Sequence, residues 1–220
     1  MRMYNPPHVV PTLVRQSSHD IGLTVVGAPK ILPQTKVLSE GYLAGMTLGI
    51  QAADLIANQG FSAVSQASEG VKGFAVLAGG HGRYKTGSHI DTDSVSLAVG
   101  ATYTQQLSAN ILTLGGFVEV GRASYDTSNT LVDKKVKGDG KAHYEGLGLL
   151  AKMNFADGFY TEGSVRVGRM HNKFNTGLFD RMGSEASYQA KSSYAGAHLG
   201  MGKIWRLGEA THIDVYPLAP

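Results

Sequence analysis

The stretch Ser94-Val-Ser-Leu-Ala-Val-Gly-Ala-Thr-Tyr103 decides the fold class, because apolar residues alternate in it with small or polar ones. Val95, Leu97, Val99 and Tyr103 fall on one face of an extended chain, and the residues between them fall on the other. The same alternation recurs to Tyr216, interrupted by Gly-rich polar gaps. Such a pattern is typical of a β-barrel with an apolar outside and a wetter inside.

Composition agrees with this reading and excludes some classes. Glycine accounts for 29 of the 220 residues, and charged residues make up only 17%, below the ~25% usual in soluble domains. The net charge of +3 comes from scattered basic residues, which does not favour nucleic acid as a partner. Without cysteine there is no disulfide framework, thiolate metal site or cysteine nucleophile.

Three regions follow one another along the chain. Residues 1–38 contain five prolines and are expected to be a linker or the end of a passenger domain, with a short strand at 21–26. Residues 39–70 predict a slim, weakly charged helix, with Ser39 as its N-cap and Glu40 in its first turn. Residues 71–220 are expected to form a partial barrel.

Seven strands are predicted in the third region: 73–84, 92–104, 109–124, 142–155, 158–173, 187–205 and 210–216. Short turns at 156–158 and 207–209 alternate with longer polar gaps at 126–141 and 175–185, as in outer-membrane barrels. The uncharged run 94–118 fits a hairpin better than a membrane-spanning helix. The N-terminus lacks the pattern of a secretory signal.

Several side chains are expected to lie inside the barrel, where a charge can be hydrated or paired. The candidates for the lumen lining are Glu119, Lys152, Glu162 and Arg166. Those on the face of the pore helix are Leu43, Met46, Ile50, Asp54, Ala57 and Asn58. Aromatic residues near strand ends are expected to form girdles at the membrane surfaces: Tyr84, Tyr103, Tyr160, Tyr194 and Trp205.

The patterns typical of catalysis and ligand binding are weak. His81 and His198 fall on predicted strands and are expected to face a lumen or an interface, without ligand spacing for a metal. Asp91 and Asp93 favour a solvated loop over a calcium site. The glycine clusters at 79–82 and 146–148 precede strands rather than helices, so they do not indicate phosphate loops. We expect no catalytic residues, no cofactor and no metal.

Ordered segments of the chain resemble the C-terminal translocator domain of bacterial autotransporters (type V secretion). They are Val37-Leu-Ser-Glu-Gly-Tyr-Leu-Ala-Gly45, Asn58-Gln-Gly-Phe61, Gly73-Phe-Ala-Val-Leu-Ala-Gly-Gly-His-Gly-Arg-Tyr84, Asp93-Ser-Val-Ser-Leu-Ala-Val-Gly-Ala101, Leu114-Gly-Gly-Phe-Val-Glu-Val-Gly121, Tyr144-Glu-Gly-Leu-Gly-Leu-Leu150 and Gly163-Ser-Val-Arg-Val-Gly-Arg169. The resemblance spans about residues 37–216. It rests on the order and spacing of the segments rather than on any single motif.

The resemblance implies an all-β, antiparallel, up-and-down transmembrane barrel of twelve strands, with an N-terminal helix threading its pore. Its implied function is moving the chain's own passenger domain to the cell surface. Its implied partners are that passenger, outer-membrane lipid, the barrel-assembly machinery and periplasmic chaperones, and its location is the bacterial outer membrane.

With about seven of twelve strands and Pro217-Leu-Ala-Pro220 after the last, we expect a truncated translocator. The alternatives left open are a soluble β-barrel or β-sandwich that serves as a binding module, and an outer-membrane hydrolase.

Overall fold

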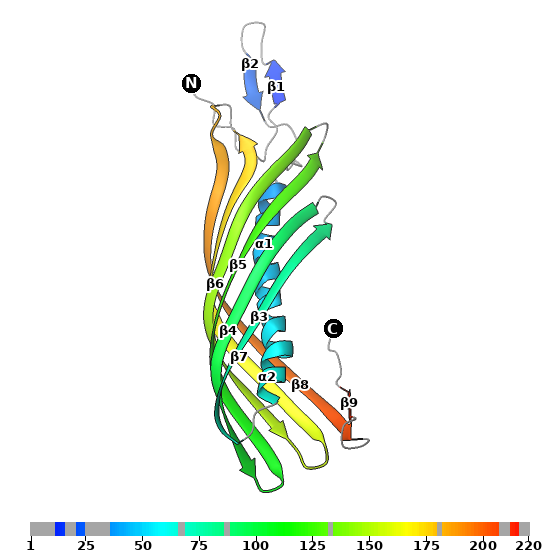
Figure 1. The fold of residues 1–220 in the computed structure, drawn as a ribbon. Coiled ribbons are helices and arrows are strands. Elements are labelled where there is room, and N and C mark those ends of the chain that lie inside the picture. Colours follow the sequence, from blue (N-terminus) through cyan, green and yellow to red (C-terminus); the bar gives the residue numbers. More distant parts are fainter. Residues whose placement is uncertain are drawn as a thin grey trace.

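The chain forms one long helical segment and a seven-stranded antiparallel sheet that curves around it (Figure 1). The computed structural model describes residues 12–15, 21–24, 36–65, 69–85, 89–131, 134–179, 182–206 and 212–215. Two strands, β1 (Thr12–Arg15) and β2 (Ile21–Thr24), make a separate antiparallel pair. β2 matches the first part of the short strand expected at 21–26, and residues 25–26 lie outside the described residues.

The strands of the large sheet follow one another in chain order. They are β3 (Gly70–Lys85), β4 (His89–Leu107), β5 (Asn110–Leu131), β6 (Lys134–Asn154), β7 (Phe159–Phe179), β8 (Glu185–Arg206) and β9 (His212–Val215). Each strand pairs antiparallel with the next, which is up-and-down topology. The predicted fold class, a partial up-and-down barrel with an N-terminal helix, is confirmed.

The long polar gaps predicted between strands are wrong. β5 continues to Leu131 and β6 begins at Lys134, so most of 126–141 is paired strand, and β7 and β8 likewise extend into 175–185. The reason is that both faces of the sheet are polar there. Thr127 and Asn129 are each 1% exposed although neither is apolar, so no apolar alternation marks the strand.

Three consecutive helical elements lie along the hollow of the sheet: α1 (Lys36–Asp54), the π-helix η2 (Leu55–Gly60) and α2 (Phe61–Ser65). The predicted N-cap at Ser39 is wrong, because the helix begins three residues earlier at Lys36. Glu40 is therefore inside the helix rather than in its first turn. Its carboxylate is buried and accepts a hydrogen bond of 2.5 Å from Asn129 of β5.

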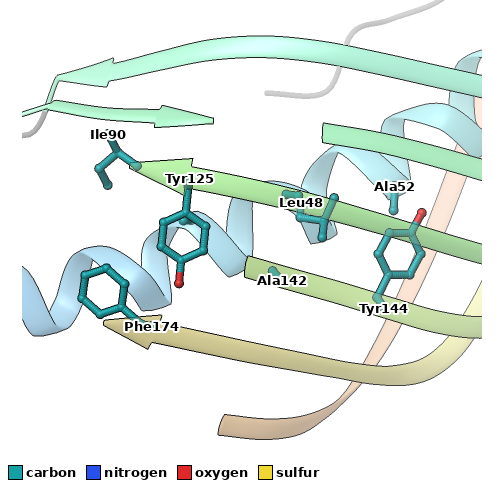
Figure 2. Packing of buried hydrophobic residues seen from close by; sticks show 9 residues of the cluster. Leu48, Ala52, Ile90, Tyr125, Ala142, Tyr144 and Phe174 are labelled. Carbon is teal, nitrogen blue, oxygen red and sulfur yellow. The ribbon is translucent and has the colours of Figure 1, made fainter. Parts of the chain in front are cut away.

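The helix packs on the sheet through its smallest residues. Ala44, Leu48 and Ala52 are buried against side chains that include Tyr125 and Phe174 (Figure 2). Glycines at positions 41, 45 and 49 share the face nearest β7. A Cβ at position 41 would lie 2.8 Å from Cγ of Phe174, so the helix can approach this closely only because the residue is glycine.

The lower half of the helix has a second, more apolar core. It joins Leu55, Ile56, Phe61 and Val64 to residues of β3–β6, namely Val76, Ala98, Phe117 and Leu150. No helix among the described residues is long and apolar enough to cross a membrane.

Candidate functional site

The helix-facing side of the sheet carries a buried charged cluster beside the helix. The carboxylate of Glu119 on β5 is 1% exposed, and Nη1 of Arg166 on β7 lies 3.1–3.2 Å from its two oxygens. The hydroxyl of Tyr194 on β8 donates to Oε1 of Glu119 at 2.7 Å. Its ring also lies 5.2 Å from the guanidinium of Arg166. The cluster therefore joins three strands through groups whose charges compensate one another.

The same face holds the helix by its backbone. Nη2 of Arg166 donates to the carbonyl oxygen of Gly49 at 2.7 Å, and Nδ2 of Asn172 donates to that of Gly41 at 2.6 Å. The hydroxyl of Tyr125 donates to Oδ1 of Asn172 at 2.6 Å and so holds the amide in this orientation. These hydrogen bonds set the rotation and the depth of the helix on the sheet.

A second ion pair lies nearer the turn end of the sheet, which is the end where the short connections 108–109 and 155–158 join the strands. Nζ of Lys152 donates to Oε2 of Glu162 at 2.9 Å and lies 4.2 Å from the ring centroid of Tyr160. His198 approaches the same glutamate at 3.9 Å, and its ring lies 5.7 Å from that of Phe61 of α2. The four residues expected in the lumen thus form two ion pairs on the helix side of the sheet.

Most of the residues named for the pore helix, which was expected to be surrounded on all sides, lie on the side that the sheet does not cover. Leu43, Met46 and Ile50 are 39%, 48% and 60% exposed, and Asp54 and Asn58 are also exposed, with Ala57 half-buried. The stripe of large apolar residues therefore does not identify the packed face. Close packing selects Gly41 and Gly45 instead, where a Cβ would lie 2.8 Å from Phe174 and 3.1 Å from Asn172, because the missing side chain allows the backbone to approach the strands.

Asn129 and Asn172 are the contributors that sequence reasoning missed. Asn129 falls in a stretch predicted to be a loop, so no strand position was assigned to it. Asn172 has the same parity along β7 as Glu162 and Arg166, and that signal was available in the sequence.

The opposite, convex face of the sheet carries the expected apolar residues. We call this set the apolar band: Val71, Leu77, Leu97, Val99, Tyr103, Leu114, Val118, Val120, Leu147, Leu149, Val165, Val167, Leu199 and Met201, all exposed. In β4 the exposed band residues alternate with Ser96, Ala98 and Thr102, each at most 4% exposed. The alternation therefore separates an apolar outside from a polar inside along the middle of the strands.

Aromatic residues lie at the turn end of the apolar band, where Tyr103 is its last member on β4. Tyr103, Phe159 and Trp205 are 45–50% exposed there, and Nζ of Lys203 lies 4.2 Å from the ring of Phe159. Tyr160 and Tyr194 were expected in the girdles, but they face the helix side. Tyr84 pairs with Ile90, which is 1% exposed, and so falls on the helix side too. Parity along the strand, not nearness to its end, decides the face.

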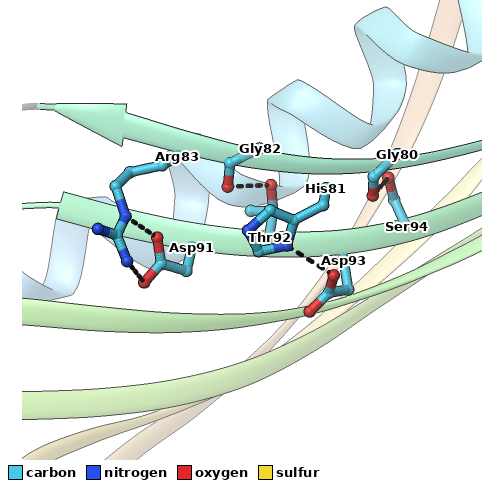
Figure 3. A network of polar contacts seen from close by, with 8 residues as sticks. All are labelled: Gly80, His81, Gly82, Arg83, Asp91, Thr92, Asp93 and Ser94. Carbon is cyan, nitrogen blue, oxygen red and sulfur yellow. Dashed lines mark hydrogen bonds and ion pairs between the residues drawn. The ribbon is translucent and has the colours of Figure 1, made fainter.

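A polar network joins the loop ends of β3 and β4 (Figure 3). Arg83 binds both oxygens of Asp91, at 2.5 and 2.9 Å, and His81 lies 2.8 Å from Asp93. The hydrogen bond from the Arg83 guanidinium lowers the pKa of Asp91 from its usual value. The reading of Asp91 and Asp93 as a solvated loop is wrong, because both lie within β4. No group of three potential metal ligands occurs among the described residues.

Comparison with known proteins finds only a weak structural similarity. No family model matches the sequence, and no curated protein matches it. Two solved structures of the ferric-catecholate import receptor Fiu from E. coli K12, a closed and an open form, are similar to part of the chain at a TM-score of 0.32 and 12% identity. The match covers 62% of this chain but only 27% and 29% of the receptor chains. A likeness at that TM-score does not establish a shared function.

Proposed function

We propose that this chain belongs to an outer-membrane translocator of the autotransporter type, in which the sheet encloses helix 36–65 and the helix connects to a passenger at the cell surface. One observation carries the proposal: the sheet presents an apolar face outward and a polar, ion-paired face to the helix. A soluble sheet of this kind would normally carry more charge on its solvent side, whereas a lipid-facing strand requires the opposite.

The dimensions of the apolar band suit a membrane. From Leu97 to Leu107, an exposed leucine on the same face of β4 beyond the band's Tyr103 and the polar Gln105, the strand rises about 33 Å, and a tilt of ~40° reduces this to about 25 Å across the bilayer. That is the height of the apolar band in outer-membrane barrels. Arg166 and Lys152 lie at this depth on the helix-facing side of the sheet. Each is ion-paired with a glutamate there and would not contact the lipid acyl chains.

A single-cysteine scan tests membrane insertion, because the chain has no cysteine of its own. The chain is folded into phosphatidylcholine vesicles with one environment-sensitive dye, attached at position 97, 99 or 118. We expect quenching by lipids that carry a nitroxide on the acyl chain. Dyes at Ser124 and Asp93, which are exposed on the same face beyond the apolar band, are the matched controls and should be quenched far less.

A soluble binding module would give equal, weak quenching at all five positions, and that result would refute membrane insertion. Transport is tested separately by fusing an epitope before residue 1 and a secretion signal before the epitope. Protease added to intact cells should remove the epitope from the full chain but not from a version lacking residues 70–215. An epitope that stays protected in cells with an inserted sheet would refute translocation alone.

A further inference from the structure

The convex face of the sheet carries a compact basic patch just beyond the apolar band. The strand register places Arg122, His143, His171 and Lys191 in one row across β5–β8. The next row toward the loops contains Ser124, Lys141, Lys173 and Gln189. Six of these eight positions are basic and none is acidic. We call the six the basic patch.

The side chains of the basic patch lie close to one another and are open to solvent. Its four lysine and arginine residues and His143 are exposed, and His171 is half-exposed. The two imidazole rings stack at 4.7 Å with an interplanar angle of 10°. Lys141 and Lys173 are direct cross-strand neighbours, an arrangement that like charges make unfavourable. A bound anion would remove this repulsion.

Acidic residues border the basic patch on three sides: Asp93 of β4 is in register with Ser124 of its second row, and the others lie one row away on either side. Glu145 lies toward the apolar band, in register with Arg169, and Asp126 and Asp139 are paired in the row toward the loops. The basic patch is therefore bounded, about 14 Å wide across four strands and two rows or ~7 Å tall. This footprint is close to that of a lipid headgroup or two.

The basic patch also adjoins an apolar surface. A shallow hollow on the convex face is lined by the aliphatic side chains of Val95, Leu97 and Val120 and by the basic ones of Arg122, Lys141 and His143, together with the carboxylates of Asp93 and Glu145. An occupant of this hollow would touch cations and aliphatic side chains at once. A phospholipid meets both demands, since its phosphate and the start of its acyl chains are adjacent, whereas a free anion meets only the first.

We propose that the basic patch binds the phosphate groups of anionic lipids. The assignment rests on the proposed function, because it requires the apolar band to lie in a bilayer. The patch is level with the start of the helix, since Asn172, between His171 and Lys173, bonds Gly41. The lipid would then belong to the cell-surface leaflet. Lysine and arginine give charge-assisted hydrogen bonds to phosphate oxygens.

The test compares two variants with the same change in charge. The patch variant carries Arg122→Gln, Lys141→Gln, Lys173→Gln and Lys191→Gln. The control variant carries Lys72→Gln, Lys85→Gln, Lys135→Gln and Lys137→Gln, which are exposed cations elsewhere on the sheet. Detergent-solubilised chain is titrated with phosphatidic acid, and bound copies are counted by native mass spectrometry. Phosphatidylcholine and inorganic phosphate are the comparison ligands.

We expect phosphatidic acid to bind the unmodified chain and the control variant alike, and to bind the patch variant at least tenfold more weakly. Equal loss in both variants, or loss in neither, would overturn the proposal. Inorganic phosphate that binds as tightly as the lipid and displaces it would overturn the lipid assignment, by showing a site for the free anion.

Trp205 gives an independent readout of insertion, because it is the only tryptophan and lies at the opposite end of the apolar band. Lipids brominated on the acyl chain should quench its fluorescence equally in vesicles containing either variant or the unmodified chain. An unquenched Trp205 in the unmodified chain would refute membrane insertion, and the lipid site with it. Quenching without preferential lipid binding would refute the lipid site alone.

Discussion

Replacing Arg166 by methionine should destabilise the folded chain more than any other single change on the helix side of the sheet. The substitution removes both hydrogen bonds to Glu119 and the one to the carbonyl oxygen of Gly49. Glu119, 1% exposed, would keep only the hydroxyl of Tyr194 as a donor. Leaving one partner of a buried ion pair uncompensated costs about 3–5 kcal/mol.

Adding Glu119→Gln to Arg166→Met should recover part of that loss. The amide removes the buried negative charge and still accepts the hydrogen bond from Tyr194, so the remaining cost is about 1–3 kcal/mol, that of buried neutral groups left without a hydrogen-bond partner. The double variant should therefore be more stable than Arg166→Met alone. This ordering separates an electrostatic cause from a simple loss of packing.

The assay is urea unfolding of the chain folded in vesicles, followed by Trp205 fluorescence. Arg169→Met is the matched control, because it makes the same substitution three residues along β7 at an exposed position, and it should change stability by less than about 0.5 kcal/mol. If Arg166→Met is as mild as the control, or if Glu119→Gln deepens its loss, the buried ion pair does not hold the sheet to the helix as argued.

Three further substitutions test the packing of the helix against β7 and the ion pair between Arg83 and Asp91. Gly41→Ala should cost about 1–3 kcal/mol in urea unfolding, because its Cβ would lie 2.8 Å from Cγ of Phe174. Gly49→Ala should be neutral or stabilising, since its Cβ meets only a methionine methyl at 3.4 Å and alanine favours helix; similar losses in both variants would contradict close packing at position 41. Arg83→Gln should raise the pKa of Asp91 toward the ordinary carboxyl value, as measured by NMR titration. Because Arg83 lowers the pKa of Asp91, the ion pair stabilises the fold above the ordinary carboxyl pKa. This stabilisation disappears as the pH falls through the lowered pKa of Asp91. A pKa of Asp91 that is the same in Arg83→Gln would show that the pair does not form.

Alternation alone assigned the middle of each strand correctly. Val99 and Val118 face out while Ala98 and Glu119 face in, because period two is a direct consequence of strand geometry. The pattern failed beyond residue 124, where Thr127 and Asn129 are buried polar residues. Their burial depends on Glu40 of the helix and on Gly138 of the next strand, and such long-range partners leave no local mark.

The rotation of the helix was not predictable from hydrophobic spacing. Leu43, Met46 and Ile50 form the conspicuous apolar stripe, yet the sheet contacts the side containing Gly41 and Gly45. Burial of apolar area alone would turn the large residues toward the sheet. The orientation of a helix along a curved sheet also depends on how closely its backbone can pack against the strands. Here close approach coincides with hydrogen bonds to the glycine carbonyls.

Both halves of the helix pack in apolar cores, and the half near its start is also held by hydrogen bonds from the sheet, which gives the assembly a direction. Near its start, Glu40, Gly41 and Gly49 are bound by polar side chains of β5 and β7. Past residue 54 the contacts are apolar, through Leu55 and the other members of the lower core. Water can replace the partner in each hydrogen bond, at a cost of about 1 kcal/mol for the neutral bond from Asn172 to Gly41 and about 1.5–3 kcal/mol for those of the charged groups of Glu40 and Arg166. Water offers no such replacement to a large buried apolar side chain, whose exposure costs about 1.5–3 kcal/mol. In the proposed translocator, the half of the helix nearer the passenger therefore combines an apolar core with exchangeable hydrogen bonds, whereas the half near the turns is held by apolar contacts.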